Sequence, residues 1–97
     1  MANYVMVFSF TTKGIENVEK APRRVEAAKE TCRNMGAEVT AFYGLMGRYD
    51  TMFILDAPDD GTALKIAAAI SREGNVRTET WRAFSESEFR DLVSSLS

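Results

Sequence analysis

Four consecutive residues of very different chemistry, Gly47-Arg48-Tyr49-Asp50, stand directly before the apolar run Met52-Phe53-Ile54-Leu55. They place a cation, a phenol and a carboxylate directly before the start of an apolar segment that is expected to be a buried strand. There the carboxylate can bind an amine or accept a proton, and the guanidinium can pair with an anion. A ligand pocket needs apolar walls with a few convergent polar groups. We therefore predict that any ligand site lies beside this turn and consists of Tyr43, Arg48, Tyr49, Asp50 and Trp81.

Each of these residues also fits a purely structural role. An aspartate after a turn glycine often accepts backbone N–H groups and closes the turn. A tyrosine or tryptophan on a strand usually packs its ring, and an arginine at a hairpin tip is usually solvated. The turn by itself does not define a reaction, so we assign no catalytic residue and favour a protein that is not an enzyme.

The rest of the composition excludes several kinds of site and partner. The 97 residues contain no histidine and one cysteine, Cys32, and their net charge of -2 is scattered along the chain. Without histidine or a second cysteine we expect no metal, no disulfide and no cofactor, and Cys32 is expected to be a buried thiol. Scattered charge predicts no binding to nucleic acid or to a membrane surface. No apolar run approaches the length of a membrane span, so we expect a cytoplasmic protein.

Apolar periodicity predicts four strands separated by helices, in the order βαββαβ, within one domain that covers residues 1–97. The first strand, residues 4–10, and the third, residues 49–55, are apolar in both orientations, which is typical of strands buried on both faces. The second strand is expected from the alternation of Val39, Ala41 and Tyr43, and the fourth at residues 75–84.

Helix signals lie between and after these strands. A short helical lead-in at residues 12–20 precedes a helix that has Pro22 in its first turn and Gly36 at its end. The inward side of this helix is expected to carry Val25, Ala28, Cys32 and Met35. The second helix ends before Gly74, and its inward residues are expected to be Ala63, Ile66, Ala67 and Ile70. Ser85 and Glu88 form a capping-box pattern for a last helix whose inward residues are expected to be Phe89, Leu92, Val93 and Leu96.

The order of elements leaves one face of the sheet without helices, because two right-handed crossovers place both main helices on the same face. Met52 and Ile54 alternate with Phe53 and Leu55, so one of these apolar pairs must lie on the open face. A large exposed apolar patch normally marks an interface. We therefore predict a homodimer, or an assembly of dimers, in which the helix-free faces meet.

The sequence also resembles a known family along most of its length. The glycine, a variable residue and Tyr-Asp at the opening of a central strand resemble the motif of the GYD family. Similar segments are Tyr4-Val5-Met6-Val7-Phe8, Gly14-Ile15, Ala21-Pro22-Arg23-Arg24, Asp56-Ala57-Pro58-Asp59-Asp60 and Gly74-Asn75-Val76-Arg77-Thr78-Glu79-Thr80. The resemblance implies an α+β, ferredoxin-like fold with an antiparallel four-stranded sheet, pairing as a dimeric α/β barrel. It implies no particular activity.

Three functions remain open at this point. The first is a non-catalytic module that binds a small molecule or serves as an accessory or regulatory protein. The Gly-x-Tyr-Asp strand opening also resembles, more weakly, the amino-acid-sensing domains of Lrp-type bacterial regulators. The second is a cofactor-free enzyme, monooxygenase- or isomerase-like, that holds a small apolar substrate between sheet and helices. The third is a structural partner in a larger complex. Fold alone does not decide among them.

Overall fold

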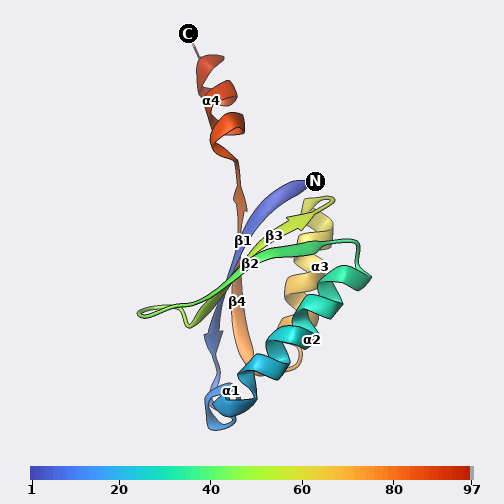
Figure 1. Cartoon of the computed structure of the whole chain (residues 1–97), viewed down its shortest axis with the longest axis vertical. Coiled ribbons are helices and arrows are strands. Elements are labelled where there is room, and N and C mark those ends of the chain that lie inside the picture. Colours follow the sequence, from blue (N-terminus) through green and yellow to red (C-terminus); the bar gives the residue numbers. More distant parts are fainter. Residues whose placement is uncertain (97) are drawn as a thin grey trace.

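The computed structural model describes residues 1–96. Its elements are β1 (Ala2–Phe10), α1 (Thr12–Glu16), the 3-10 helix η1 (Val18–Lys20), α2 (Ala21–Asn34), β2 (Glu38–Gly44), β3 (Thr51–Ala57), α3 (Asp60–Ser71), β4 (Val76–Ala83) and α4 (Glu86–Ser94). The strands form one antiparallel sheet in the order β2-β3-β1-β4. Helices α2 and α3 lie on the same face of that sheet (Figure 1). The predicted α+β fold is therefore confirmed.

Local sequence signals set several of the helix ends, and those at Ser85 and Gly36 are the ones predicted. Asp59 begins α3, because its carboxylate accepts the Thr62 N–H at 2.7 Å. Ser85 and Glu88 form a reciprocal capping box at the start of α4. Gly36 follows α2 with a φ of 80°, a left-handed conformation that glycine adopts without steric cost. These caps mark where the helices begin and end.

The core lies between the sheet and the two main helices. Its largest fully buried side chains are Phe53, Met6, Leu55, Ile66 and Cys32. The strand register places Met6 opposite Phe53, and these residues face the helices. The intervening residues Val5, Val7, Met52 and Ile54 consequently lie on the helix-free face. Burial also raises the pKa of the Cys32 thiol to about 11, so this thiol is a packing group.

A bulge in β2 changes the predicted alternation of that strand. The pairing with β3 shifts between Val39, which lies opposite Leu55, and Ala41, which lies opposite Ile54. The extra residue reverses the face on which the following side chains lie. Val39 and Phe42 therefore both pack against the core. The expectation that Val39, Ala41 and Tyr43 share one face is wrong, because period-two reasoning assumes an unbroken ladder.

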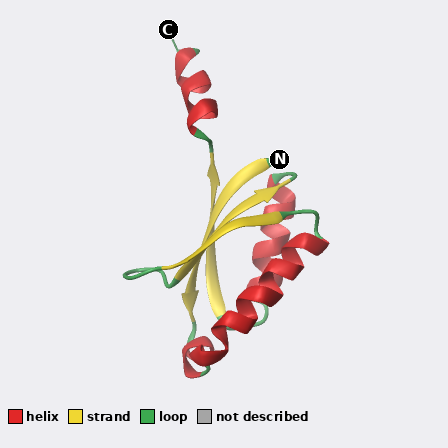
Figure 2. Ribbon diagram, in the orientation of Figure 1, coloured by secondary structure: helices red, strands yellow, loops and turns green. Residues whose placement is uncertain are grey.

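Two further expectations about inward side chains are wrong. Met35 is 37% exposed, because α2 ends at Asn34 and Met35 already lies in the turn that follows. The apolar residues of α4, and Leu96 in the turn that follows it, are also exposed: Phe89 is 61% and Leu96 81% accessible. Figure 2 shows α4 at the far end of β4, away from the other helices.

The short helix α1 is held against the loop that leads into β4. Thr11 donates its backbone N–H to the Asn75 carbonyl at 3.0 Å and its hydroxyl to the Gly74 carbonyl at 2.6 Å. Lys13 Nζ donates to the Glu73 carbonyl at 2.9 Å. Gly14 lies so close to this loop that a Cβ atom would stand 2.0 Å from the Asn75 carbonyl oxygen. Close backbone approach therefore requires glycine here.

Candidate functional site

The Gly47–Asp50 turn is joined to β1 through Asp50. The Asp50 carboxylate accepts the backbone N–H of Phe10 at 2.8 Å, and the Asp50 N–H donates to the Phe8 carbonyl at 2.8 Å. The Asp50 carbonyl accepts the Leu45 N–H at 2.8 Å and so closes the hairpin. Gly47 has a φ of 117°, as expected for its turn role. The Asp50 side chain and backbone thus bind the end of β1 to the turn through two hydrogen bonds.

Tyr49 and Trp81 come together around a glutamate. The Tyr49 hydroxyl donates to Glu79 at 2.6 Å, and the Trp81 indole N–H donates to the other oxygen of the same carboxylate at 3.0 Å. The two rings meet edge to face, with centroids 6.1 Å apart. The hydrogen bond from Tyr49, followed by that from Trp81, lowers the pKa of Glu79, and the same bond raises the pKa of Tyr49.

This cluster lies on the helix-free face and spans a strand. Tyr49 precedes β3 and Glu79 belongs to β4, so the hydrogen bond between them passes over β1. Val7 of β1 is paired with Met52 on one side and Glu79 on the other. Although it faces away from the helices, Val7 is only 3% exposed. We infer that the Tyr49–Glu79–Trp81 cluster contributes to its cover.

The structure brings together only some of the residues predicted to form a ligand site. The Arg48 guanidinium lies 5.8 Å from the centre of the Tyr49 ring, so it joins the cluster with Trp81. Asp50 points instead to the end of β1. Tyr43 lies on the edge strand β2 and is 56% exposed. The five residues therefore do not form one enclosed pocket, and their binding role stays a prediction.

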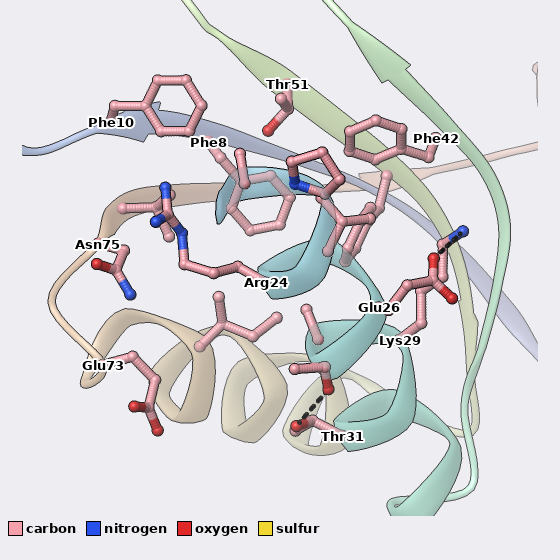
Figure 3. A pocket seen from close by; sticks show the side chains of 18 of the residues that line it. Phe8, Phe10, Arg24, Glu26, Lys29, Thr31, Phe42, Thr51, Glu73 and Asn75 are labelled. Atoms are coloured by element: carbon pink, nitrogen blue, oxygen red, sulfur yellow. Dashed lines mark hydrogen bonds and ion pairs between the residues drawn. The ribbon is translucent and has the colours of Figure 1, made fainter. Parts of the chain in front are cut away.

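A large cavity lies on the opposite side of the sheet, beside α2. It has a volume of about 710 Å³. Figure 3 shows Phe8, Phe10, Phe42 and Thr51 on the sheet and Arg24 on α2 around it. The remaining lining residues are Ala21, Pro22, Val25, Glu26, Ala27, Ala28, Lys29, Thr31, Gly44, Phe53, Ala69, Ile70, Glu73, Asn75 and Val76.

The wall that the sheet gives to this cavity is aromatic. Phe53 is packed edge to face against Phe8, with ring centroids 4.9 Å apart, and against Phe42 at 5.9 Å. Edge-to-face pairs add about 0.5–1.5 kcal/mol beyond the area they bury. The wall therefore presents a continuous aromatic surface to the cavity.

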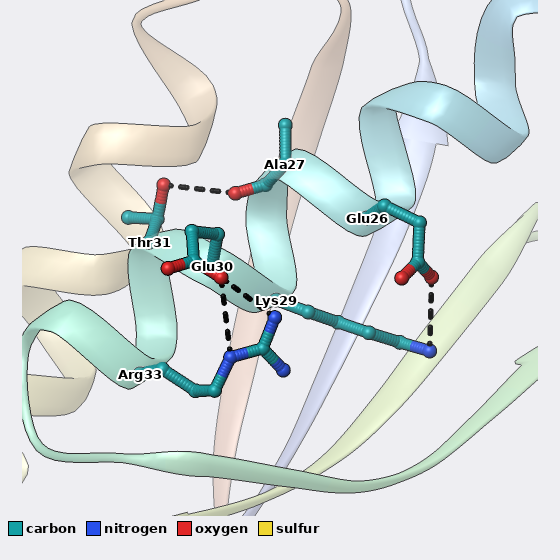
Figure 4. Close-up of polar contacts among 6 residues, drawn as sticks. All are labelled: Glu26, Ala27, Lys29, Glu30, Thr31 and Arg33. Atoms are coloured by element: carbon teal, nitrogen blue, oxygen red, sulfur yellow. Dashed lines mark hydrogen bonds and ion pairs between the residues drawn. The ribbon is translucent and has the colours of Figure 1, made fainter.

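Three of the four charged side chains that line the cavity, Arg24, Glu26 and Lys29, already have a polar partner. Arg24 donates to the Asn17 and Gly14 carbonyls, each at 3.0 Å, and so satisfies the end of α1. Glu26 and Lys29, which both line the cavity, form an ion pair at 3.3 Å. A second ion pair on the same helix joins Glu30 and Arg33 at 2.8 Å, and Figure 4 shows both pairs. The lining contains two cations and two carboxylates. This balance disfavours a strongly charged ligand.

The prediction from sequence missed the cavity because its walls are ordinary apolar residues. Phe8 and Phe10 stand two apart on β1 and therefore share a face, which was a usable signal. Phe42 was not detectable in the same way, because the bulge in β2 turns it to that face. Arg24 follows Pro22 in the first turns of α2, and nothing in its sequence neighbourhood predicts its contacts with α1.

A smaller cavity of about 260 Å³ lies at the first turn of α3. The Tyr4 hydroxyl donates to Asp60 at 2.5 Å beside it. Burial, and then this hydrogen bond, raise the pKa of Tyr4.

Among residues 1–96, no group of three or more histidine, cysteine or acidic side chains is placed to hold a metal ion. Within the same range, every helix is too short or too polar to cross a bilayer.

Comparison with known proteins finds similarities both in sequence and in fold. The family model described as GYD domain matches residues 4–93. The chain is 30% identical over 84 residues to the "Glutamine synthetase and cystathionine beta-lyase binding protein" of Thermus thermophilus, covering 86% of this chain and 88% of that protein. Its fold is similar to the crystal structure of the protein TTHA0845, also from Thermus thermophilus (TM-score 0.57, 22% identity, 87% of this chain and 94% of that one).

The fold is also similar to the crystal structure of the leucine response regulatory protein of Mycobacterium tuberculosis (TM-score 0.65, 15% identity). That match covers 87% of this chain and 51% of the regulator, so this chain spans about half of the regulator's length. At this identity the likeness concerns the ferredoxin-like fold alone, which agrees with the predicted fold class.

Proposed function

This chain belongs to the GYD domain family, and we propose that it is a non-catalytic binding module whose ligand is a small, uncharged, apolar molecule. The observation that carries the proposal is the 710 Å³ cavity beside α2. Ligand sites are commonly concave, about 300–1,000 Å³ in volume, and lined by apolar and aromatic side chains with a few polar groups. The cavity matches this description in both size and lining.

The class of ligand follows from the cavity walls. Four phenylalanines at the cavity, Phe8, Phe10, Phe42 and Phe53, offer ring faces and edges to an apolar or aromatic molecule. The guanidinium of Arg24 already donates to two carbonyls, and Glu26 pairs with Lys29. A carboxylate or phosphate ligand would have to compete with these contacts, whereas an uncharged molecule leaves them in place.

Filling the cavity tests this proposal. Ala28 lines the cavity and is only partly buried, so Ala28→Phe would occupy the space without opening the core. With Nile red, an uncharged apolar dye, as the probe in a fluorescence titration, we expect the dissociation constant to rise at least tenfold. The matched control is Ala68→Phe on the exposed side of α3, which should bind the dye like the wild type. Equal binding by the Ala28→Phe protein would refute the cavity as the ligand site.

A second candidate function is an accessory protein that binds enzymes. It is supported by the relative in Thermus thermophilus, whose name describes binding to glutamine synthetase and cystathionine beta-lyase, and by the exposed apolar residues of α4, which suit a protein interface. With the protein immobilised, we expect glutamine synthetase or cystathionine beta-lyase from the same cell to bind with a micromolar or lower dissociation constant. The absence of binding by both enzymes at tens of micromolar would count against this candidate.

The protein is further proposed to act as a homodimer through its helix-free sheet face. Val5, Met52 and Ile54 on that face are only partly buried within one chain. A domain of this length buries only about 60–65% of its unfolded surface, so covering these side chains adds useful stability. The rival function, a cofactor-free enzyme acting on an apolar substrate, would use the same cavity beside α2 and stays a prediction.

A further inference from the structure

The C-terminal helix α4 has an apolar side that its own chain does not cover. Phe89, Leu92 and Val93 of α4, and Leu96 in the turn directly after it, recur at helical spacing, and all four are about half exposed or more. Ser87 and Asp91 lie on the opposite side of the helix, by the same periodicity. An amphipathic surface helix normally places such an apolar stripe against a core. Here the stripe projects from the end of the molecule.

The connection to β4 keeps α4 away from the body of its own chain. Only Phe84 and Ser85 separate the end of β4 from the start of α4. The Arg82 guanidinium lies 4.3 Å from the centre of the Phe84 ring, and the capping box orients the first turn of the helix. Figure 1 shows α4 continuing outward beyond the sheet. A two-residue connector held in this way leaves little freedom for the helix to fold back.

The exposed surface of the chain is larger than that of a compact monomer. Its accessible area is 6375 Å², whereas a compact protein of 10.8 kDa exposes about 5500 Å². The radius of gyration is 14.6 Å, against about 12.5 Å for a compact chain of this length. The excess area is close to the roughly 800 Å² that each partner contributes to a standard interface. One interface of ordinary size would account for it.

We propose that α4 packs, through the apolar side formed by Phe89, Leu92, Val93 and Leu96, against a second copy of this chain. The inference rests on the proposed homodimer and extends its interface from the sheet to the helix. A second copy fits because the chain carries two uncovered apolar surfaces, the helix-free sheet face and α4. In an isologous dimer the same patch is buried on both subunits. A single two-fold axis can therefore bury the sheet face and the apolar side of α4 on each of the two subunits.

Sedimentation velocity on the full chain over a range of protein concentrations tests this contact. The wild type is expected to have twice the 10.8 kDa chain mass. Leu92→Glu places a charge within the apolar side and should raise the dimer dissociation constant at least tenfold. Ser87→Glu adds the same charge on the opposite side of α4 and should leave the constant unchanged. Because Leu92 is exposed within one chain, Leu92→Glu should keep the fold, and Leu96→Glu serves in its place if circular dichroism shows unfolding.

A parallel variant, Met52→Glu, separates this inference from the proposed sheet dimer. If Met52→Glu weakens the dimer and Leu92→Glu does not, the sheet interface stands and the role of α4 is refuted. If Leu92→Glu alone weakens it, α4 makes the contact and the sheet does not. A wild-type monomer at every concentration would overturn both, as would binding of α4 only to another protein. Equal weakening by Leu92→Glu and Ser87→Glu would also refute a contact specific to the apolar side.

Discussion

Gly14→Ala is expected to lower the free energy of unfolding by about 3 kcal/mol, near the upper end of the usual cost of overpacking a tight contact. The new Cβ atom would stand 2.0 Å from the Asn75 carbonyl oxygen, which is a backbone atom. That carbonyl is itself held by the Thr11 N–H at 3.0 Å. Relief therefore requires α1 and the loop before β4 to separate, with loss of the hydrogen bonds between them. Urea unfolding at one fixed protein concentration measures the change.

Gly61→Ala is the matched control for Gly14→Ala. Gly61 lies in α3, and among residues 1–96 the one side chain near its added Cβ is that of Asp59, whose oxygen would lie 3.5 Å away. Alanine is a better helix former than glycine by about 1 kcal/mol, so Gly61→Ala should leave stability unchanged or raise it. If Gly14→Ala unfolds at the same urea concentration as Gly61→Ala, the close approach of α1 to Asn75 is not a constraint on the fold.

Asp50→Ala is expected to lower the free energy of unfolding by about 1–3 kcal/mol, the cost of leaving a hydrogen-bonding group without its charged partner. The change removes the carboxylate that accepts the Phe10 N–H at 2.8 Å. Because Phe10 lines the cavity, the same change should also weaken Nile red binding. Thermal and urea unfolding give the stability, and dye titration of the folded protein gives the binding.

Asp50→Asn distinguishes the structural role of Asp50 from a role in binding. Asparagine keeps an oxygen that can accept the Phe10 N–H but removes the charge, so stability should fall by less than in Asp50→Ala. If Asp50 instead holds a ligand beside the Gly47–Asp50 turn, Asp50→Asn should abolish binding of that ligand while the unfolding curve barely moves. That second result would support the ligand site predicted from sequence, and it would contradict the view that Asp50 serves only to join the turn to β1.

Much of the fold could be predicted because its signals are local. Gly36 and Gly74 adopt the positive φ expected after a helix, and Ser85 with Glu88 forms the predicted cap. Such signals depend on residues that are close in sequence, so they can be read without knowing the tertiary structure. The bulge in β2 was not predictable in the same way, because a bulge is defined by the pairing of two residues with one on the partner strand, here β3, and this pairing places Phe42 on the cavity side.

The candidate sites show the same division between sequence and structure. The sequence identified Arg48, Tyr49 and Trp81 as chemically unusual, and the structure brings them together around Glu79. It did not indicate that Asp50 bonds to β1, because that contact joins residues forty positions apart. The cavity beside α2 was equally hidden, since apolar residues lining a space and apolar residues filling one look alike in a sequence.

By itself, the amino-acid sequence determined the order of strands and helices, several of the helix ends, and the existence of two-sided apolar strands and an amphipathic C-terminal helix. Only the tertiary structure decided that Phe53 and Leu55 face the helices while Met52 and Ile54 face outward. It also decided that α4 projects from the body with its apolar side uncovered. The physical reason is that periodicity reports which side chains share a face, whereas the surface that covers this face belongs to another part of the chain or to another molecule.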